Sequence, residues 1–143
     1  MKVSQNFILE EFVAPDIYAE RGDKSIELLD NRIISLAQFF RDYFGSITIN
    51  NWDSGGQYKE SGLRSFTTTT GAKWSQHRFG RGADLKFTGT TPQKAYAEVL
   101  KHQKLFYEKG LRVMENITAT PSWLHIDIRY LNSAEQKITI VNP

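Results

Sequence analysis

Residues 123–129 read Trp123-Leu124-His125-Ile126-Asp127-Ile128-Arg129, the clearest structural signal in the chain. Apolar and ionisable side chains alternate along it, which is the period of a β-strand with one face on the core. The ionisable side chains of His125, Asp127 and Arg129 therefore share the face opposite the apolar row. Such a row predicts one wall of a functional site, and its alternative is an ordinary solvated strand edge.

Further strand signals lie on both sides of this stretch. Residues 111–115 precede it across the turn-rich segment 116–122, and the pair predicts an antiparallel hairpin. A last strand over 137–141 could pair beside that hairpin. Earlier in the chain, residues 47–50 alternate apolar and polar, and residues 83–87 regain strand character after a long segment rich in Gly, Ser and Thr.

Two longer segments carry apolar residues at helical spacing. The first runs over residues 24–44 and ends at Gly45, the usual residue at a helix C-terminus. The second begins at Thr91, with Pro92 in the first helical position, and closes before Gly110. We therefore expect an α+β fold, in which two main helices pack on a small antiparallel sheet.

The chain length of 143 residues favours a single domain over residues 1–143. Residues 1–23 are expected to form an N-terminal arm. Pro15 and Gly22 interrupt regular structure there, so the arm is predicted to be irregular. Its apolar residues predict that the arm packs on the body of the domain.

Composition narrows the classes of function. A hydrophobic fraction of 40% and an aromatic fraction of 13% indicate a packed core rather than disorder. The chain has no cysteine, which excludes thiol nucleophiles, disulfides and Cys-ligated zinc. A net charge of +2 is too balanced for a clustered nucleic-acid-binding surface. No stretch reaches the roughly 18 apolar residues of a membrane span, and the N-terminal residues do not read as a secretory signal. We expect a monomer made in the cytoplasm.

Three residues form a candidate metal site: His77, Asp84 and His125. Gly80 and Gly82 oppose a helix between the first two and favour a sharp turn into a strand, which would bring their side chains together. Two imidazoles and one carboxylate are a standard ligand set for catalytic zinc and leave one coordination position open. The alternative is a metal-free protein in which both histidines are surface residues.

The same residues lie in motifs that resemble a known family. The string Ser75-x-His77-x-x-Gly80-x-x-x-Asp84 resembles the metal-binding motif of D-Ala-D-Ala carboxypeptidases and L-alanoyl-D-glutamate endopeptidases, the endolysin-type zinc peptidases related to the hedgehog signalling domain. Ser61-Gly62-Leu63-Arg64-Ser65 is similar to the segment upstream of the first ligand, and residues 123–129 to the hairpin of the last ligand. Residues 6–12 are similar to the start of one branch. One departure is Gly82, where the family motif has alanine.

This resemblance implies a hedgehog/DD-peptidase-like fold with His77, Asp84 and His125 as zinc ligands. It also implies a hydrolase in which a zinc-activated water attacks amide bonds of peptidoglycan peptides. A phage or prophage endolysin, or a virion component, would meet the cell wall in that way, the former after lysis. Arg64 would hold a substrate carboxylate or the developing oxyanion, and its alternative role is a salt bridge that braces the loop.

The general base is where the sequence departs from the family pattern. Many members carry Glu or Asp three residues before the last histidine ligand, and here that position is Ser122, which cannot take a proton from water. Glu115 is the favoured substitute and Asp127 the second, although Asp127 could instead fix an imidazole. If neither reaches the water, the protein would be a non-catalytic zinc-bearing module that binds the cell wall or builds a phage particle.

Four other residues receive plainer predictions. Trp52, Trp74 and Trp123 flank the motif segments, and packing in the core or at the rim of a cleft is expected for each. His102 has lysines on both sides and is expected to face solvent.

Overall fold

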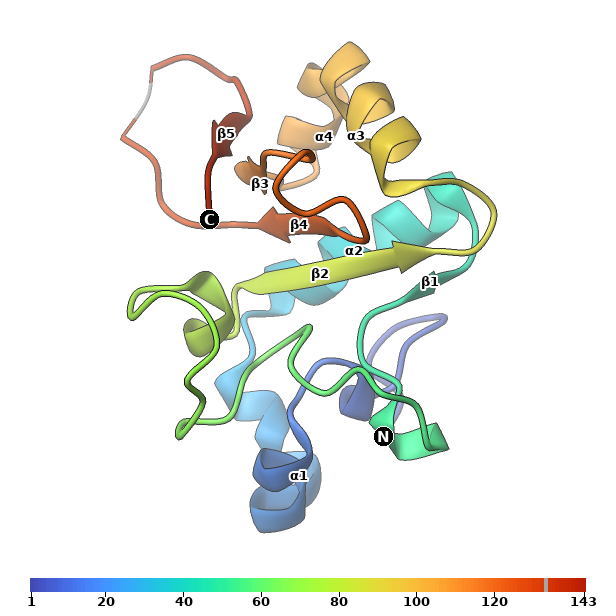
Figure 1. The fold of residues 1–143 in the computed structure, drawn as a ribbon, viewed down its shortest axis with the longest axis vertical. Coiled ribbons are helices and arrows are strands. Elements are labelled where there is room, and N and C mark those ends of the chain that lie inside the picture. The colour runs from blue at the N-terminus through green and yellow to red at the C-terminus, as the bar shows by residue number, and fades with distance from the viewer. Residues whose placement is uncertain (133) are drawn as a thin grey trace.

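The computed structural model describes residues 1–132 and 134–143, which form four α-helices and a five-stranded sheet, with α1 apart from the sheet (Figure 1). The order of strands across the sheet is β1-β2-β4-β3-β5. The strands span Ile47–Thr48 (β1), Gly82–Phe87 (β2), Val113–Glu115 (β3), Leu124–Asp127 (β4) and Thr139–Val141 (β5). The long strands β2 and β4 therefore occupy the inner part of the sheet.

The sheet is mixed, so the prediction of an antiparallel sheet is wrong at one edge. β2 pairs with β1 and with β4 in antiparallel fashion, and β3 and β4 form the predicted antiparallel pair. β5, however, pairs with β3 in parallel. The connection after β4 reverses the chain direction and places β5 on the far side of β3, so β5 runs in the same direction as β3.

The alternation of residues 123–129 is confirmed, but both faces of β4 are buried. Leu124 and Ile126 have no exposed surface and belong to the core. On the opposite face, the exposed fraction is 2% for His125 and 0% for Asp127. Because β4 lies between β2 and β3, its ionisable row is enclosed rather than placed at a solvated edge.

The first long helix begins later than predicted. α2 spans Asn31–Phe44, and residues Gly22–Leu28 form a separate 3-10 helix before it. Asp30 causes the interruption, since its Oδ1 accepts a hydrogen bond from the backbone N–H of Arg32 at 3.0 Å. A carboxylate that satisfies a free amide in this way favours the start of a helix over its continuation.

The second predicted helix is divided at His102 into α3 (Pro92–Lys101) and α4 (Gln103–Glu108). With φ of −122° and ψ of 41°, His102 lies outside the helical region. After this break, α4 places Phe106 against the aromatic side chains of α2. The predicted start is confirmed, because Thr91 Oγ1 accepts a hydrogen bond from a first-turn amide at 3.1 Å.

The N-terminal arm packs on the body as predicted, but it is not irregular throughout. Pro15–Arg21 form a short helix, α1, in which Pro15 occupies the first turn instead of breaking structure. Phe7, Leu9 and Phe12 are at most 1% exposed, which anchors the arm in the common core.

The core lies between the sheet and the helices. α2 contacts β1 and β2, and α3 contacts β2 and β4. Ala83 and Leu85 of β2 face this core with no exposed surface, which leaves Asp84 and Lys86 for the opposite face. Among the described residues, none of the helices combines the length and the apolar character that a bilayer crossing requires.

Candidate metal centre

Strand register brings two of the three predicted ligands together. Asp84 on β2 stands directly opposite His125 on β4 in the antiparallel ladder. His77 belongs to a 3-10 helix over Gln76–Phe79 that ends at Gly80 in the left-handed conformation, with φ of 65°. An added Cβ at Gly80 would overlap the carbonyl oxygen of Leu28, so this turn into β2 requires glycine.

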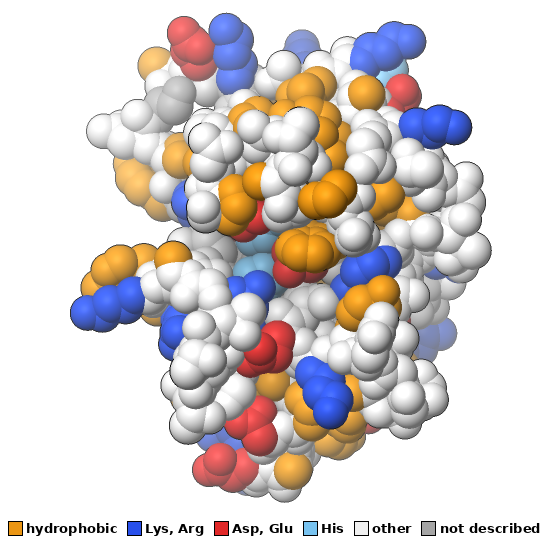
Figure 2. All heavy atoms as spheres, viewed as in Figure 1, with side chains coloured by type: hydrophobic (Ala, Val, Ile, Leu, Met, Phe, Trp, Pro, Cys, Tyr) orange, Lys and Arg blue, Asp and Glu red, His pale blue; other side chains and the backbone are white. Residues whose placement is uncertain are grey.

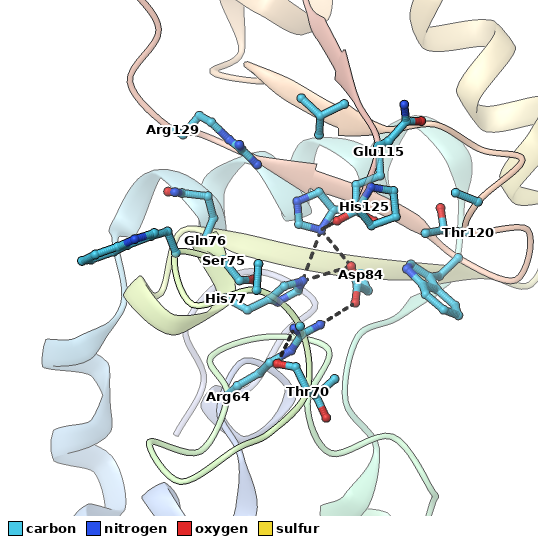
Figure 3. A pocket seen from close by; sticks show the side chains of 18 residues that line it. Arg64, Thr70, Ser75, Gln76, His77, Asp84, Glu115, Thr120, His125 and Arg129 are labelled. Atoms are coloured by element: carbon cyan, nitrogen blue, oxygen red, sulfur yellow. Dashed lines mark hydrogen bonds and ion pairs between the residues drawn. The ribbon is translucent and has the colours of Figure 1, made fainter.

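The three side chains converge on one point, and this buried group could hold a metal ion (Figure 3). His77 Nε2 lies 3.1 Å from Asp84 Oδ1 and 3.2 Å from His125 Nδ1. The third distance, from His125 Nδ1 to Asp84 Oδ1, is 3.0 Å. Ligand atoms about 2.0–2.1 Å from a tetrahedral cation lie about 3.3 Å from one another, so the spacing fits one ion.

Hydrogen bonds on the far side of each imidazole fix its tautomer. His77 Nδ1 lies 2.8 Å from the carbonyl oxygen of Gly62, which can only accept, so Nδ1 carries the proton. His125 Nε2 likewise donates to Asp127 Oδ2 at 2.8 Å. In the neutral rings, the remaining nitrogens therefore present lone pairs to each other and to the Asp84 carboxylate. Three lone pairs without a proton between them call for a cation.

The charges of the group agree with this need. Burial favours the neutral form of Asp84, but His77 and His125 outweigh it and hold the pKa of that carboxyl well below its usual range. Burial also disfavours a charged His125, yet its hydrogen bonds to Asp127 and Asp84 raise the pKa of His125 to about 10. Without a metal, the site therefore retains a proton in the place of the cation.

The segment Ser61–Arg64 braces two of the ligands. The Ser61 carbonyl accepts from the backbone N–H of Asp84 at 2.8 Å. Arg64 donates its backbone N–H to the carbonyl of His77 at 3.2 Å, alongside the bond from the His77 ring to Gly62. A Cβ at Gly62 would overlap the backbone of Phe12, so only glycine permits this close approach of the arm. The segment that resembles the family motif thus supports the metal centre through its backbone.

Arg64 lies beside the group, with features of both roles predicted for it. Its Nη2 is 3.6 Å from Asp84 Oδ2, the carboxylate oxygen that faces away from the two imidazoles. Its Nε donates to the carbonyl of Glu60 at 3.0 Å and its Nη1 to that of Thr70 at 3.4 Å. The side chain therefore braces the loop while it lines the cleft over the metal centre.

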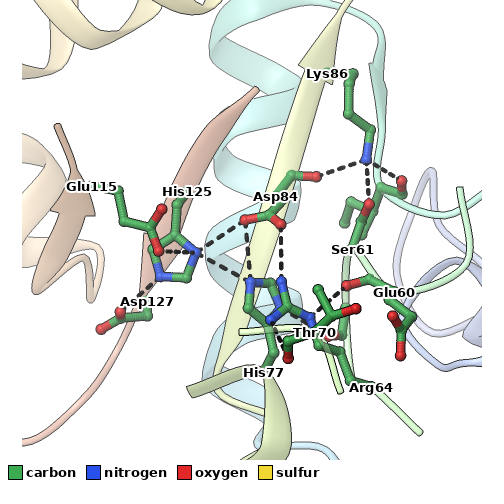
Figure 4. A network of polar contacts seen from close by, with 12 residues as sticks. Glu60, Ser61, Arg64, Thr70, His77, Asp84, Lys86, Glu115, His125 and Asp127 are labelled. Carbon is green, nitrogen blue, oxygen red and sulfur yellow. Dashed lines mark hydrogen bonds and ion pairs between the residues drawn. The ribbon is translucent and has the colours of Figure 1, made fainter. Parts of the chain in front are cut away.

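The two candidate bases occupy different places (Figure 4). Glu115, at the end of β3, lines the cleft with 19% of its side chain exposed, and its Oε1 is 3.7 Å from His125 Nδ1. Asp127 has no exposed surface and lies behind the ring of His125, where Arg129 holds both its carboxylate oxygens. Burial raises the pKa of Asp127, but hydrogen bonds from His125 and Arg129 outweigh burial and hold that pKa below its ordinary value. The carboxylate therefore stays ionised. This is the arrangement of a carboxylate that orients an imidazole.

The metal centre opens into a cleft of about 620 Å³, which we call the main cleft. Figure 2 shows histidine and acidic side chains at the bottom of a hollow between two halves of the molecule. Trp74, 71% exposed, and Trp123, 36% exposed, stand at its rim. Trp52 instead packs against the arm, where its indole N–H donates to the carbonyl of Val13 at 2.9 Å. His102 is largely exposed and pairs with Glu98 at 3.2 Å.

Lys86 lies beside the candidate metal centre and was not predicted from the sequence. It follows Asp84 by two positions on β2, and that spacing alone places both side chains on one face of the strand. Its ammonium donates to Ser61 Oγ at 2.7 Å, to the Asp84 carbonyl at 3.1 Å and to the Ile49 carbonyl (Figure 4). Burial outweighs the attraction of Asp84 and lowers the pKa of Lys86 to about 8. Lys86 thus ties the backbone of a ligand to two neighbouring segments.

Comparison of the chain with protein-family models, with curated proteins and with solved structures gives no match.

Proposed function

We propose that this protein is a zinc-dependent peptidase that hydrolyses amide bonds in peptidoglycan peptides. The observation that carries the proposal is the convergence of three lone pairs, from His77 Nε2, Asp84 Oδ1 and His125 Nδ1, at distances of 3.0 to 3.2 Å. An open cleft above them supports catalysis rather than a closed structural site. The cell-wall substrate and a hedgehog/DD-peptidase-like fold rest on the resemblance of the motifs.

Each residue has a distinct part in the proposed reaction. A zinc ion supplies Lewis-acid chemistry, which polarises a carbonyl and activates water. Glu115 takes a proton from the attacking water and returns it to the leaving amine, because it is the carboxylate that faces the cleft beside His125. Arg64 stabilises the negative charge that develops on the carbonyl oxygen. Asp127 is a positioning residue that holds His125 in the tautomer required for metal binding.

The alternative is a zinc-bearing module that binds the cell wall or builds a phage particle without cutting peptides. Its support is Ser122, which occupies the position where many members of the family that the motifs resemble carry a Glu or Asp general base. Either role brings the protein to a substrate outside the cytoplasm, after lysis or as part of a virion. The two functions share the metal centre and differ in whether Glu115 activates water for hydrolysis.

Metal analysis and wall clearing together test the proposal. Purified protein should contain about one zinc per chain and should lower the turbidity of a suspension of purified cell walls. Glu115→Gln should slow clearing by about 10²–10⁴-fold, the usual contribution of a general base, and retain its zinc. Zinc without clearing by the unmutated protein would favour the non-catalytic module. Absence of bound metal at neutral pH would remove both functions.

A further inference from the structure

All three candidate ligands line the main cleft, and one of them, Asp84, also lines a second cavity. Beside the main cleft is a second cavity of about 320 Å³, which we call the side hollow; it is lined by residues 57–61 and Lys86. Four residues border both spaces, namely Arg64, Thr70, Asp84 and Trp123. Because Asp84 belongs to the metal-ligating group, a chain that crosses the metal centre finds space on both sides of it.

Two buried polar atoms in the wall of the main cleft have no hydrogen-bond partner among the described residues. They are Gln76 Oε1 and Thr120 Oγ1. Thr120 is 2% exposed as a residue. Buried polar groups are nearly always paired, so each of these atoms points to a missing partner. Figure 3 shows Gln76 and Thr120 on opposite sides of the three ligands. A peptide backbone that runs across the metal centre can donate an N–H to Gln76 Oε1, and it can donate an N–H to Thr120 Oγ1 or accept from that hydroxyl through a C=O.

The arginines of the main cleft already face carboxylates of the protein. Arg64 Nη2 lies 3.6 Å from Asp84, and Arg129 holds Asp127 through two of its nitrogens. A carboxypeptidase needs a cation for the terminal carboxylate of its substrate. Asp127 thus balances the charge of Arg129, and the proposed reaction uses Arg64 for the developing oxyanion. Neither arginine of the main cleft is then left for a terminal carboxylate next to the scissile bond, which favours a substrate without one there.

From these observations, and resting on the proposed peptidase function, we infer that the protein is an endopeptidase. The main cleft and the side hollow bind one extended peptide, and the amide over the metal centre lies inside that peptide. Gln76 and Thr120 hold its backbone on either side of the bond that is cut. Binding of residues on both sides contributes to the rate, because interactions remote from the scissile bond support the chemical step.

Capped peptides test this inference directly. The probes are L-Ala-D-Glu-L-Lys-D-Ala-D-Ala with free ends and the same peptide with an acetylated N-terminus and an amidated C-terminus. Mass spectrometry of the products should show cleavage at an internal amide of both, with kcat/KM changed less than about tenfold by the caps. Release of the terminal D-Ala alone, abolished by the amide cap, would make the protein a carboxypeptidase and overturn the inference while the peptidase function stands.

Two substitutions test which side of the scissile bond Gln76 and Thr120 each bind. Thr120→Val removes the side-chain hydroxyl and Gln76→Met removes the side-chain amide, each with little change in volume. Each should lower kcat/KM by about threefold to tenfold, the value of one hydrogen bond. The loss should vanish for a substrate that lacks the residues on that side. Thr88→Val, at an exposed position after β2, serves as the matched control and should behave as the unmutated protein. Equal losses on full and shortened substrates would overturn the assignment of the two sides.

A binding measurement separates this inference from the proposed catalysis. Calorimetry with Glu115→Gln loaded with zinc gives the Kd of the capped peptide, whose integrity is checked by mass spectrometry. Removal of residues from either end should weaken binding by about threefold or more. An unmutated protein that cuts nothing, with Glu115→Gln showing this pattern, would refute the peptidase and retain the two-sided cleft. A Kd that depends on one end only, or no binding, would overturn the inference.

Discussion

Asp84 and His125 stand opposite each other on adjacent antiparallel strands, with Asp84 Oδ1 and His125 Nδ1 3.0 Å apart. Antiparallel pairing places the side chains of opposite residues on the same face of the sheet. The two ligands are therefore positioned by the register of β2 and β4, deep in the sheet. His77 joins them from a short 3-10 helix that glycine turns back onto the start of β2. Two ligands placed by strand register and one presented by a short 3-10 helix thus build the candidate metal centre.

Removal of any of the three candidate ligands should strongly weaken zinc binding, whereas removal of the exposed His102 should not. His77→Ala, Asp84→Ala and His125→Ala should each weaken zinc affinity by more than about a hundredfold, since even a partner behind a ligand is worth 10–100-fold. Competition with a chromophoric chelator measures the affinity. His102→Ala is the matched control, because the exposed His102 pairs with Glu98 on the surface, outside the candidate metal centre. Zinc bound as tightly after loss of His125 would disprove the site.

Asp127→Asn should weaken zinc binding although Asp127 is not a ligand. The amide can present its NH₂ to His125 Nε2, which would move the ring proton to Nδ1, the atom that faces the metal. We expect about 10–100-fold lower zinc affinity with circular dichroism unchanged. Asp42→Asn, on the exposed face of α2, should leave the affinity as it was. If zinc affinity stays unchanged and only hydrolysis is lost, Asp127 acts as a base instead.

The metal-free protein should lose stability as pH rises from 6.5 to 8. The pKa of His125 is raised to about 10 from its ordinary 6.5, so its proton stabilises the fold fully below pH 6.5, and this contribution fades as pH rises towards 10. Lys86 acts in the opposite sense above pH 8, because its pKa is lowered to about 8. Measured in chelator between pH 6.5 and 8, Tm should fall, and His125→Gln should flatten the slope.

Zinc should counteract the loss of stability that the metal-free protein shows as pH rises. The metal competes with the proton on His125, so the gain in Tm on addition of zinc should grow over the same pH range. His102→Gln should show both slopes unchanged, as a control for titration elsewhere. A gain in Tm that is constant with pH would mean that zinc does not displace this proton.

Lys86→Met should weaken both the fold and the metal centre. The change leaves the Ile49 and Asp84 carbonyls without their donor, at a cost of about 1–3 kcal/mol in the free energy of unfolding. Zinc affinity should fall by about tenfold because the Lys86 ammonium no longer links the Asp84 carbonyl to the Ser61 hydroxyl and the Ile49 carbonyl. Lys109→Met, which removes a surface lysine lying over Phe39, is the control. Lower stability with zinc affinity intact would limit Lys86 to a structural part.

Local features of the fold could be predicted because they depend on neighbouring residues. The alternation of residues 123–129 predicts β4, and Thr91 and Gly45 mark helix ends through bonds within one turn. The predicted start of α2 was wrong because a helical pattern of apolar residues extends before Asp30. The capping bond of Asp30 outweighs that pattern and begins the helix at Asn31. The donor types His, Asp and His likewise predicted the composition of the candidate site.

The sequence by itself determined the strand periodicity, the helix caps and a set of candidate metal-ligating side chains. Only the tertiary structure decided that β5 runs parallel to β3, that Asp127 is sealed behind His125, and that Lys86, Gln76 and Thr120 belong to the site. The physical reason is the distance along the sequence over which the deciding interactions act. Periodicity and caps arise from contacts within a few residues, whereas register, tautomer and burial depend on segments that meet only when the whole chain has packed.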